Sequence, residues 1–201
     1  MIEIMEPVLK TIAFAVIAYL LGSIPFAILV TRAKAGVDVR GSGSGHAGAT
    51  NTMRAAGWVP GIIVLVADVG KGYLAVWLAA SFGGTEAAPI VAAACVVIGH
   101  CRPIFAGFRG GMGMASGGGA LLAVWPLGFV LAVGLGSALQ LLIKHSARGN
   151  IVTGLLLMPL WALSGANGTQ MGVALAVGLV ISGRALSDWN RVYRELWFDR
   201  E

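Results

Sequence analysis

Charged side chains are scarce in this sequence. Asp, Glu, Lys and Arg make up 11% of its 201 residues, whereas a soluble domain carries about 25%. Hydrophobic residues make up 57% of the chain, and the mean hydropathy is +0.84. This composition excludes a soluble globular domain, and it argues against nucleic acid as a partner because little charged surface is left to bind it. We predict an integral membrane protein.

Residues that bind metals or form disulfides are also few. The two cysteines, Cys95 and Cys101, lie within or just after one apolar run. No other cysteine offers the spacing of a zinc site or a disulfide framework. We interpret both cysteines as packing residues, and we predict no metal site.

Long apolar runs predict an all-α, polytopic membrane fold in a single domain, residues 1–201. A helix needs about 20 apolar residues to cross a bilayer. Trp125-Pro126 interrupts the run from Gly117 to Ile143, and we divide the run there because proline breaks a helix. If the proline only kinks the helix, one span fewer results. We predict seven transmembrane helices, at residues 11–30, 60–80, 87–99, 114–124, 127–143, 151–163 and 170–183.

The basic residues predict the orientation, because Lys and Arg collect in short cytoplasmic loops. Most of the 14 basic residues fall in the first, third and fifth connections and after the last span, whereas residues 81–86 and 164–169 contain none. We therefore predict that the N-terminus lies outside and the C-terminus in the cytoplasm. The net charge of +5 is then cytoplasmic, which suits anionic headgroups or a phosphorylated substrate.

This orientation places three polar segments on the cytoplasmic side. They are the first (residues 38–51), second (108–119) and third (145–150) polar segments, and each combines glycine, a hydroxyl or amide group and arginine. Backbone N–H groups and a guanidinium can share one phosphate, so we predict that the segments converge on a phosphate site. Flexible turns between packed helices are the alternative. The first segment also matches G-x-G-x-x-G, but it neither follows a strand nor opens a βαβ unit, so a dinucleotide site is excluded.

Asp68 and Lys71 lie inside the second predicted span. Ionisable groups in a membrane helix usually face a partner or a polar cavity, and residues three apart on a helix can pair with each other. The sequence leaves two possibilities open, a structural ion pair and a pair that faces a site.

Four motifs resemble those of the bacterial acyl-phosphate:glycerol-3-phosphate acyltransferase family, in order and along the whole chain. Residues 22–26 resemble its GSIPF start, and Arg40 followed by GSGSGHAGATN resembles its R-x-x-GSGNxGATN loop. Residues 68–72 resemble D-x-x-KG, and residues 99–105 resemble the GH-x-x-P-x-F approach to its FKGGKGVAT loop.

The resemblance implies an enzyme of the bacterial plasma or inner membrane, multi-pass, with its active site facing the cytoplasm. Such enzymes transfer an acyl chain from acyl phosphate to the 1-hydroxyl of glycerol 3-phosphate. The products are lysophosphatidic acid, the first intermediate of phospholipid biosynthesis, and inorganic phosphate. The partners are therefore these two substrates and membrane lipid, and no metal or organic cofactor is required.

The resemblance also implies the site residues. Those expected to act in catalysis are His46, Gly43, Gly45, Thr50, Asn51, His100, Gly110 and Gly111. Those expected to bind substrate phosphate are Ser23, Arg40, Ser44, Lys71, Arg109, Gly113, Ser116, Arg148, Asn150 and Arg191.

The sequence departs from the family pattern at polar positions. Met112 stands at the lysine of GGKG, His46 at the asparagine of GSGN, and Ala147, Ala185 and Asp188 at a serine, a histidine and an asparagine. We hypothesise that His46 replaces the histidine lost at Ala185, while Arg148 or Arg109 supplies the charge that Met112 lacks. Two alternatives are a non-catalytic or altered-specificity paralogue that binds phosphorylated lipid or substrate, and a transporter-like binding module.

Overall fold

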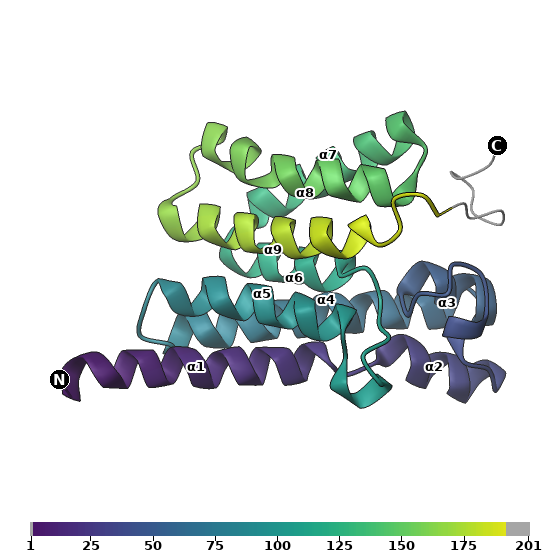
Figure 1. The fold of residues 1–201 in the computed structure, drawn as a ribbon, viewed down its shortest axis with the longest axis horizontal. Coiled ribbons are helices and arrows are strands. Elements are labelled where there is room, and N and C mark those ends of the chain that lie inside the picture. The colour runs from purple at the N-terminus through teal and green to yellow at the C-terminus, as the bar shows by residue number, and fades with distance from the viewer. Residues whose placement is uncertain (1, 192–201) are drawn as a thin grey trace.

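The chain folds into a bundle of helices. The computed structural model describes residues 2–191, and over these residues the regular structure is entirely helical (Figure 1). The helices are α1 (Ile2–Gly22), α2 (Phe26–Ala35), α3 (Ala49–Ala56), α4 (Trp58–Phe82), α5 (Ala87–Cys101), α6 (Met114–Val124), α7 (Pro126–Ile143), α8 (Ser146–Leu163) and α9 (Gly168–Leu186), with short 3-10 turns at Val39–Gly41 and Ile104–Ala106. The predicted all-α class is confirmed.

Five helical segments are long and apolar enough to cross a membrane. They are Met5–Ala35, Trp58–Phe82, Ala87–Ala106, Pro126–Ile143 and Gly168–Leu186, and Met114–Val124 is a shorter apolar helix. A multi-pass membrane fold is therefore confirmed. The predicted number of seven spans and the orientation of the termini remain predictions, and residues 192–201 lie outside the described residues.

Two prolines set helix boundaries, one as predicted and one not. Pro126 begins α7 directly after α6 ends, as expected for a residue without an N–H. The run at residues 11–30, predicted as one helix, is divided: α1 ends at Gly22 and α2 begins at Phe26. Pro25 lies at this break for the same reason.

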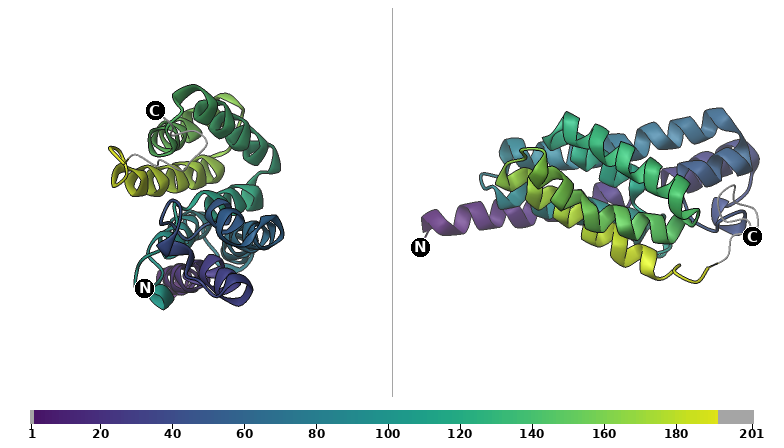
Figure 2. Two further views of the ribbon diagram at one scale, coloured as in Figure 1. Left: turned by 90° about the vertical axis from the view of Figure 1, so that its right-hand side faces the viewer. Right: turned by 90° about the horizontal axis from the view of Figure 1, so that it is seen from above.

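The helices form two layers, with α7, α8 and α9 stacked over α1 to α5 and α6 between them (Figures 1 and 2). Glycines allow close approach within and between the layers. A Cβ at Gly72 of α4 would collide with the Ser116 carbonyl of α6, and one at Gly99 of α5 with the Tyr19 carbonyl of α1. The buried core between these helices consists mainly of alanine and valine.

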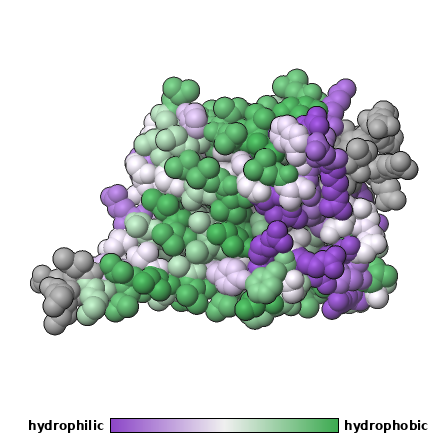
Figure 3. Space-filling model, in the orientation of Figure 1, coloured by the Kyte–Doolittle hydropathy of each residue, from purple (hydrophilic) through white to green (hydrophobic). Residues whose placement is uncertain are grey.

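The surface separates into an apolar belt and a polar end. Large apolar side chains point outward along the helices; Leu142 is 77% and Leu163 90% exposed, as expected for contact with lipid. Hydrophilic residues gather at the end of the molecule where α3 and the last turn of α9 lie (Figure 3). The polar segments that were predicted to converge link the helices at this end.

Candidate functional site

The helix break between α1 and α2 is held by a lysine from α4. The ammonium of Lys71 donates to the carbonyl oxygen of Ile24 at 3.0 Å and lies 2.8 Å from Oδ1 of Asp68. It also stands 5.6 Å from the centre of the Phe26 ring. Because Pro25 interrupts the helix, this part of the backbone needs partners from elsewhere, and Lys71 supplies one.

Asp68 is shared between that lysine and a histidine of α5. Nδ1 of His100 lies 3.5 Å from Oδ1 of Asp68. The three residues are 1%, 5% and 7% exposed for Asp68, Lys71 and His100 respectively. The sequence left open a structural pair or a pair at a site; the structure has an ion pair that also borders a pocket.

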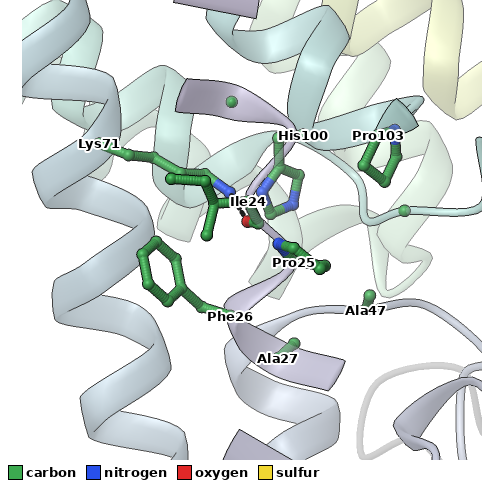
Figure 4. Close-up of a pocket in the computed structure, with 10 residues that line it drawn as sticks. Ile24, Pro25, Phe26, Ala27, Ala47, Lys71, His100 and Pro103 are labelled. Atoms are coloured by element: carbon green, nitrogen blue, oxygen red, sulfur yellow. Dashed lines mark hydrogen bonds between the residues drawn. The ribbon is translucent and has the colours of Figure 1, made fainter. Parts of the chain in front are cut away.

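A small pocket opens beside this charged cluster. Its empty volume, including the part open to solvent, is about 210 Å³. Lys71 from α4 and His100 from α5 both point toward the Ile24–Pro25 backbone (Figure 4). The lining residues are Gly22, Ile24, Pro25, Phe26, Ala27, Ala47, Lys71, His100, Pro103 and Gly110.

Asn51 shapes the first polar segment. Its amide nitrogen donates to three carbonyls, those of Val39 at 2.8 Å and of Ser42 and His46 at 3.0 Å. Its oxygen accepts the Ser44 N–H at 3.3 Å. Gly43 and Gly45 have φ of +51° and +72°, a backbone conformation that residues with a side chain rarely adopt. The loop therefore wraps around one buried amide.

The second polar segment packs against the first and against His100. The Gly111 N–H donates to the His100 carbonyl at 3.1 Å, and the Gly110 carbonyl accepts the Ala47 N–H at 3.4 Å. A Cβ at Gly111 would collide with both the His100 ring and the Ala47 carbonyl. The Gly110 N–H likewise donates to the Cys101 carbonyl, at 3.2 Å, so both N–H groups that could have faced an oxyanion donate to the backbone in this structure.

Arg40 clamps the same two segments together. Its guanidinium binds the carboxylate of Asp38 through two nitrogens, at 3.0 and 2.8 Å, and donates to the carbonyls of Ala106 at 2.8 Å and Arg109 at 3.3 Å. The hydrogen bond from Arg40 holds the pKa of Asp38 well below its usual range. Most N–H groups of the Arg40 guanidinium are thus engaged within the protein. Asp38 was not among the site residues expected from the sequence.

The end of α9 meets the first polar segment through a histidine and an aspartate. Nε2 of His46 lies 2.9 Å from Oδ2 of Asp188, and the two residues are 7% and 4% exposed. Burial lowers the pKa of His46 to about 4, although the Asp188 charge opposes the shift. Two arginines flank the carboxylate on its other oxygen, with Nη1 of Arg184 at 3.9 Å and Nη1 of Arg191 at 3.7 Å.

Comparison with known proteins identifies the family. A family model described as Glycerol-3-phosphate acyltransferase matches residues 12–195. The chain belongs to this family. The glycerol-3-phosphate acyltransferase of Laribacter hongkongensis (strain HLHK9) is 38% identical over 181 residues, which is 88% of this chain and 89% of that one. Glycerol-3-phosphate acyltransferase 2 of Moorella thermoacetica (strain ATCC 39073 / JCM 9320) is 44% identical over 137 residues, 68% and 70% of the two chains.

Solved structures of the same family share the fold. The crystal structure of PlsY (YgiH), an integral membrane glycerol 3-phosphate acyltransferase, in its glycerol 3-phosphate form superposes with a TM-score of 0.79 at 31% identity, over 90% of each chain. The lysophosphatidic acid form gives a TM-score of 0.77 at 29% identity, again over 90% of each chain. The resemblance stated from the motifs is therefore confirmed.

Three departures from the acyltransferase motifs meet in one place. Ala147, Ile151 and Ala185 form a small buried cluster, and the partly buried Met112 packs against it. A lysine at residue 112 would bring an ammonium to this apolar contact. The departures at residues 112, 147 and 185 therefore lie together in this chain, in an apolar contact.

The compensation by Arg148 or Arg109 remains a prediction. The Arg148 guanidinium stands 5.2 Å from the centre of the Trp189 ring, and Arg109 is exposed. His46 does lie at the end of α9 that carries Ala185 and Asp188, as the relocation hypothesis requires. Its role in catalysis remains a prediction.

The other residues expected at the acyltransferase site have local partners or face solvent. Ser23 Oγ accepts the Ile104 N–H at 3.4 Å, Ser116 Oγ donates to the Gly113 carbonyl at 3.2 Å, and Asn150 Oδ1 accepts from Gln140 at 2.6 Å. Thr50 is exposed in the first turn of α3. Arg184 and Asp68 were not among the expected site residues; a charged residue within an apolar helix was the available signal for both.

Proposed function

We propose that this chain transfers an acyl group from acyl phosphate to the 1-hydroxyl of glycerol 3-phosphate. The products are lysophosphatidic acid, for phospholipid biosynthesis, and inorganic phosphate. The observation that carries the proposal is the match of fold and sequence, over nine-tenths of the chain, to a glycerol 3-phosphate acyltransferase in its glycerol 3-phosphate form. We place the reaction at the polar end of the molecule, where the first and second polar segments meet.

Each step of the transfer has a chemical requirement. The hydroxyl oxygen of glycerol 3-phosphate attacks the acyl carbonyl carbon, and an ester C–O bond forms. The C–O bond to the phosphate breaks, and phosphate leaves with the electron pair. The hydroxyl proton passes to a phosphate oxygen, either that of the leaving group or that of the acceptor. The protein has to hold two anions close together and stabilise the oxyanion between them.

Cations at the polar end match these requirements. Arg102 and Arg109 are exposed there, and Arg191 has a 46% exposed side chain. The acyl chain of the donor reaches the site from the lipid that surrounds the apolar belt. We infer that the site faces the cytoplasm of a bacterial cell, because the basic residues gather at this end.

Turnover of purified protein tests the proposal. Palmitoyl phosphate and glycerol 3-phosphate are added to the protein in detergent or lipid, and both phosphate release and lysophosphatidic acid are measured. We expect the two products in equal amounts, and none when glycerol replaces glycerol 3-phosphate. Asn51→Ala supplies a matched inactive control, because loss of one amide removes four hydrogen bonds from the first polar segment.

Absence of lysophosphatidic acid with folded protein would overturn the proposal. If glycerol 3-phosphate nevertheless binds, the result supports a non-catalytic protein that binds phosphorylated ligands. If palmitoyl phosphate is hydrolysed without transfer, water takes the place of the acceptor and transfer to glycerol 3-phosphate is ruled out.

A further inference from the structure

The His46–Asp188 pair joins two parts of the chain that are far apart in sequence. Nε2 of His46 and Oδ2 of Asp188 are 2.9 Å apart, in a region where the two residues are 7% and 4% exposed. His46 belongs to the first polar segment, and Asp188 follows the last turn of α9. In a buried region, a contact at this distance between an imidazole and a carboxylate is electrostatically stronger than it would be in water.

His46 is tied at its backbone as well as at its ring. Its N–H donates to Ser44 Oγ at 3.4 Å, and its carbonyl accepts from Asn51 at 3.0 Å. The next residue, Ala47, donates to Gly110 of the second polar segment and lines the pocket beside Lys71. The backbone of His46 is thus held by the first polar segment and is followed directly by a residue of the pocket wall.

Asp188 also orients a cation over the same loop. Its Oδ1 lies 3.7 Å from Nη1 of Arg191. A Cβ built on Gly45 would stand 3.1 Å from Nη2 of that arginine, so the guanidinium lies directly against the loop. A phosphate at this point would meet a guanidinium and the backbone of a glycine loop together.

The ring of His46 stays uncharged at neutral pH, because burial keeps its pKa near 4. The Asp188 carboxylate contacts this uncharged ring through Oδ2 and faces the two arginines through Oδ1. Among the described residues, the titratable groups that face Asp188 are His46, Arg184 and Arg191.

We propose that Asp188 is a positioning residue for the acceptor: through His46 and Arg191 it fixes the first polar segment in the shape that binds the phosphate of glycerol 3-phosphate. The proposal rests on the function proposed above. It assigns His46 a holding role rather than that of the proton acceptor, and it places the acceptor phosphate beside the Arg191 guanidinium where it lies against the loop at Gly45.

Substitutions at Asp188 test the positioning role, because they should affect the KM for one substrate and not for the other. We expect Asp188→Ala to raise the KM for glycerol 3-phosphate by about tenfold or more, the loss typical of a charge-assisted hydrogen bond. The KM for palmitoyl phosphate should stay within about twofold. Asp188→Asn keeps an acceptor for His46 but loses the charge, and should fall between Asp188→Ala and the wild type. Asn190→Ala, exposed in the same turn, is the control and should behave as wild type.

Substitutions at His46 separate holding from proton transfer. The amide nitrogen of glutamine can take the place of Nε2 and donate to Asp188, but glutamine does not accept a proton near neutral pH. We expect His46→Gln to retain most of the activity and His46→Ala to match Asp188→Ala. The double variant His46→Ala with Asp188→Ala should be no worse than either alone, because the two residues act as a unit.

Three results would overturn the inference. The first is an unchanged KM for glycerol 3-phosphate in folded Asp188→Ala protein. The second is an equal loss for both substrates together with a large drop in melting temperature, which indicates a general structural role. The third is inactivity of His46→Gln to the level of His46→Ala, which makes the imidazole itself part of the chemistry.

Calorimetric binding of glycerol 3-phosphate keeps this test separate from that of the proposed function. If the wild type does not turn over but binds glycerol 3-phosphate, weaker binding by Asp188→Ala still supports the positioning role. If the wild type turns over and Asp188→Ala binds as tightly as the wild type, only the positioning role fails. If the wild type neither turns over nor binds, both proposals are wrong.

Discussion

Lys71 illustrates how one side chain can serve several elements. Its ammonium contacts a carboxylate on its own helix and a carbonyl at the break between α1 and α2. The same carboxylate reaches His100 of α5. Because these groups are almost fully buried, each of them depends on a protein partner to offset the loss of water. The charge of Lys71 is therefore required by the fold before any substrate is considered.

Lys71→Met should destabilise the protein strongly. The Asp68 carboxylate would stay buried without its ammonium partner, and breaking a buried ion pair in this way costs about 3–5 kcal/mol. Thermal unfolding in detergent measures the loss. The double variant with Asp68→Asn should recover a large part of it, because the unpaired charge is removed.

Lys10→Met is the matched control, since Lys10 forms an ion pair with Glu6 whose side chains are 49% and 70% exposed. Such surface pairs contribute little to stability. A melting temperature for Lys71→Met as high as for Lys10→Met would contradict the importance of the buried pair.

At the scale of single residues, the sequence indicated which positions are special better than what each side chain contacts. The motifs singled out the glycines, Asn51, Lys71 and His100, and of these Lys71, His100 and Gly110 line one pocket; their roles stay predictions. The partners of site residues could not be predicted from the sequence. Arg40, for example, binds the carbonyls of Ala106 and Arg109, and every residue type has a backbone carbonyl. The contact of His46 with Asp188 also depends on packing between distant segments.

Among the helices, close contact at glycine decides the arrangement. α4 and α6 approach each other at Gly72, where a Cβ would collide with the Ser116 backbone, and at Gly119, where it would collide with the Val69 carbonyl. Backbone atoms do not move aside as the end of a flexible side chain does. The two helices therefore stay at this distance only while both positions are glycine.

Gly72→Ala should push α6 away from α4 and lower the melting temperature and the activity together. Gly70→Ala in the same helix is a matched control, because a Cβ there meets nothing within 4 Å. The control should be as stable as the wild type or slightly more so, since alanine favours helix over glycine by about 1 kcal/mol. Equal melting temperatures for the two variants would show that α6 is free to shift.

The apolar runs predicted membrane helices, but they did not predict the break at residues 23–25. Hydropathy averaged over residues 11–30 stays high across Ser23 and Pro25, so the run resembles one span. The division at Pro126 was predicted because tryptophan and proline interrupt a run too long for one helix. Proline marks a helix boundary in both cases. Only at Pro126 was the apolar run long enough to reveal that boundary from the sequence.

Over the whole molecule, the polar end and the apolar belt define how the protein lies in a bilayer. Exposed Leu142 and Leu163 require lipid around them, and the hydrophilic residues gather at one end (Figure 3). Lys and Arg are retained on the cytoplasmic side. The membrane class was thus predictable from composition and the all-α fold from the apolar runs, whereas the depth of each helix in the bilayer was not.

Labelling with a membrane-impermeant maleimide tests the predicted orientation in intact cells. In a background of Cys95→Ala and Cys101→Ala, cysteine is introduced at Ala33, which keeps the basic neighbours, or at Ser164. Both residues are exposed. We expect Ser164→Cys to be labelled from outside, and Ala33→Cys only after the cells are opened. The reverse pattern would place the site outside.

The contact between the first polar segment and the end of α9 also bears on the order in which the protein is made. Residues 38–51 leave the ribosome before α4 to α9 exist, and Asp188 is synthesised after all of them. A nascent chain that has inserted α1 to α8 holds the loop but not the carboxylate that orients it. The proposed role of Asp188 therefore implies that the chain gains its ability to hold the acceptor only when synthesis is almost finished.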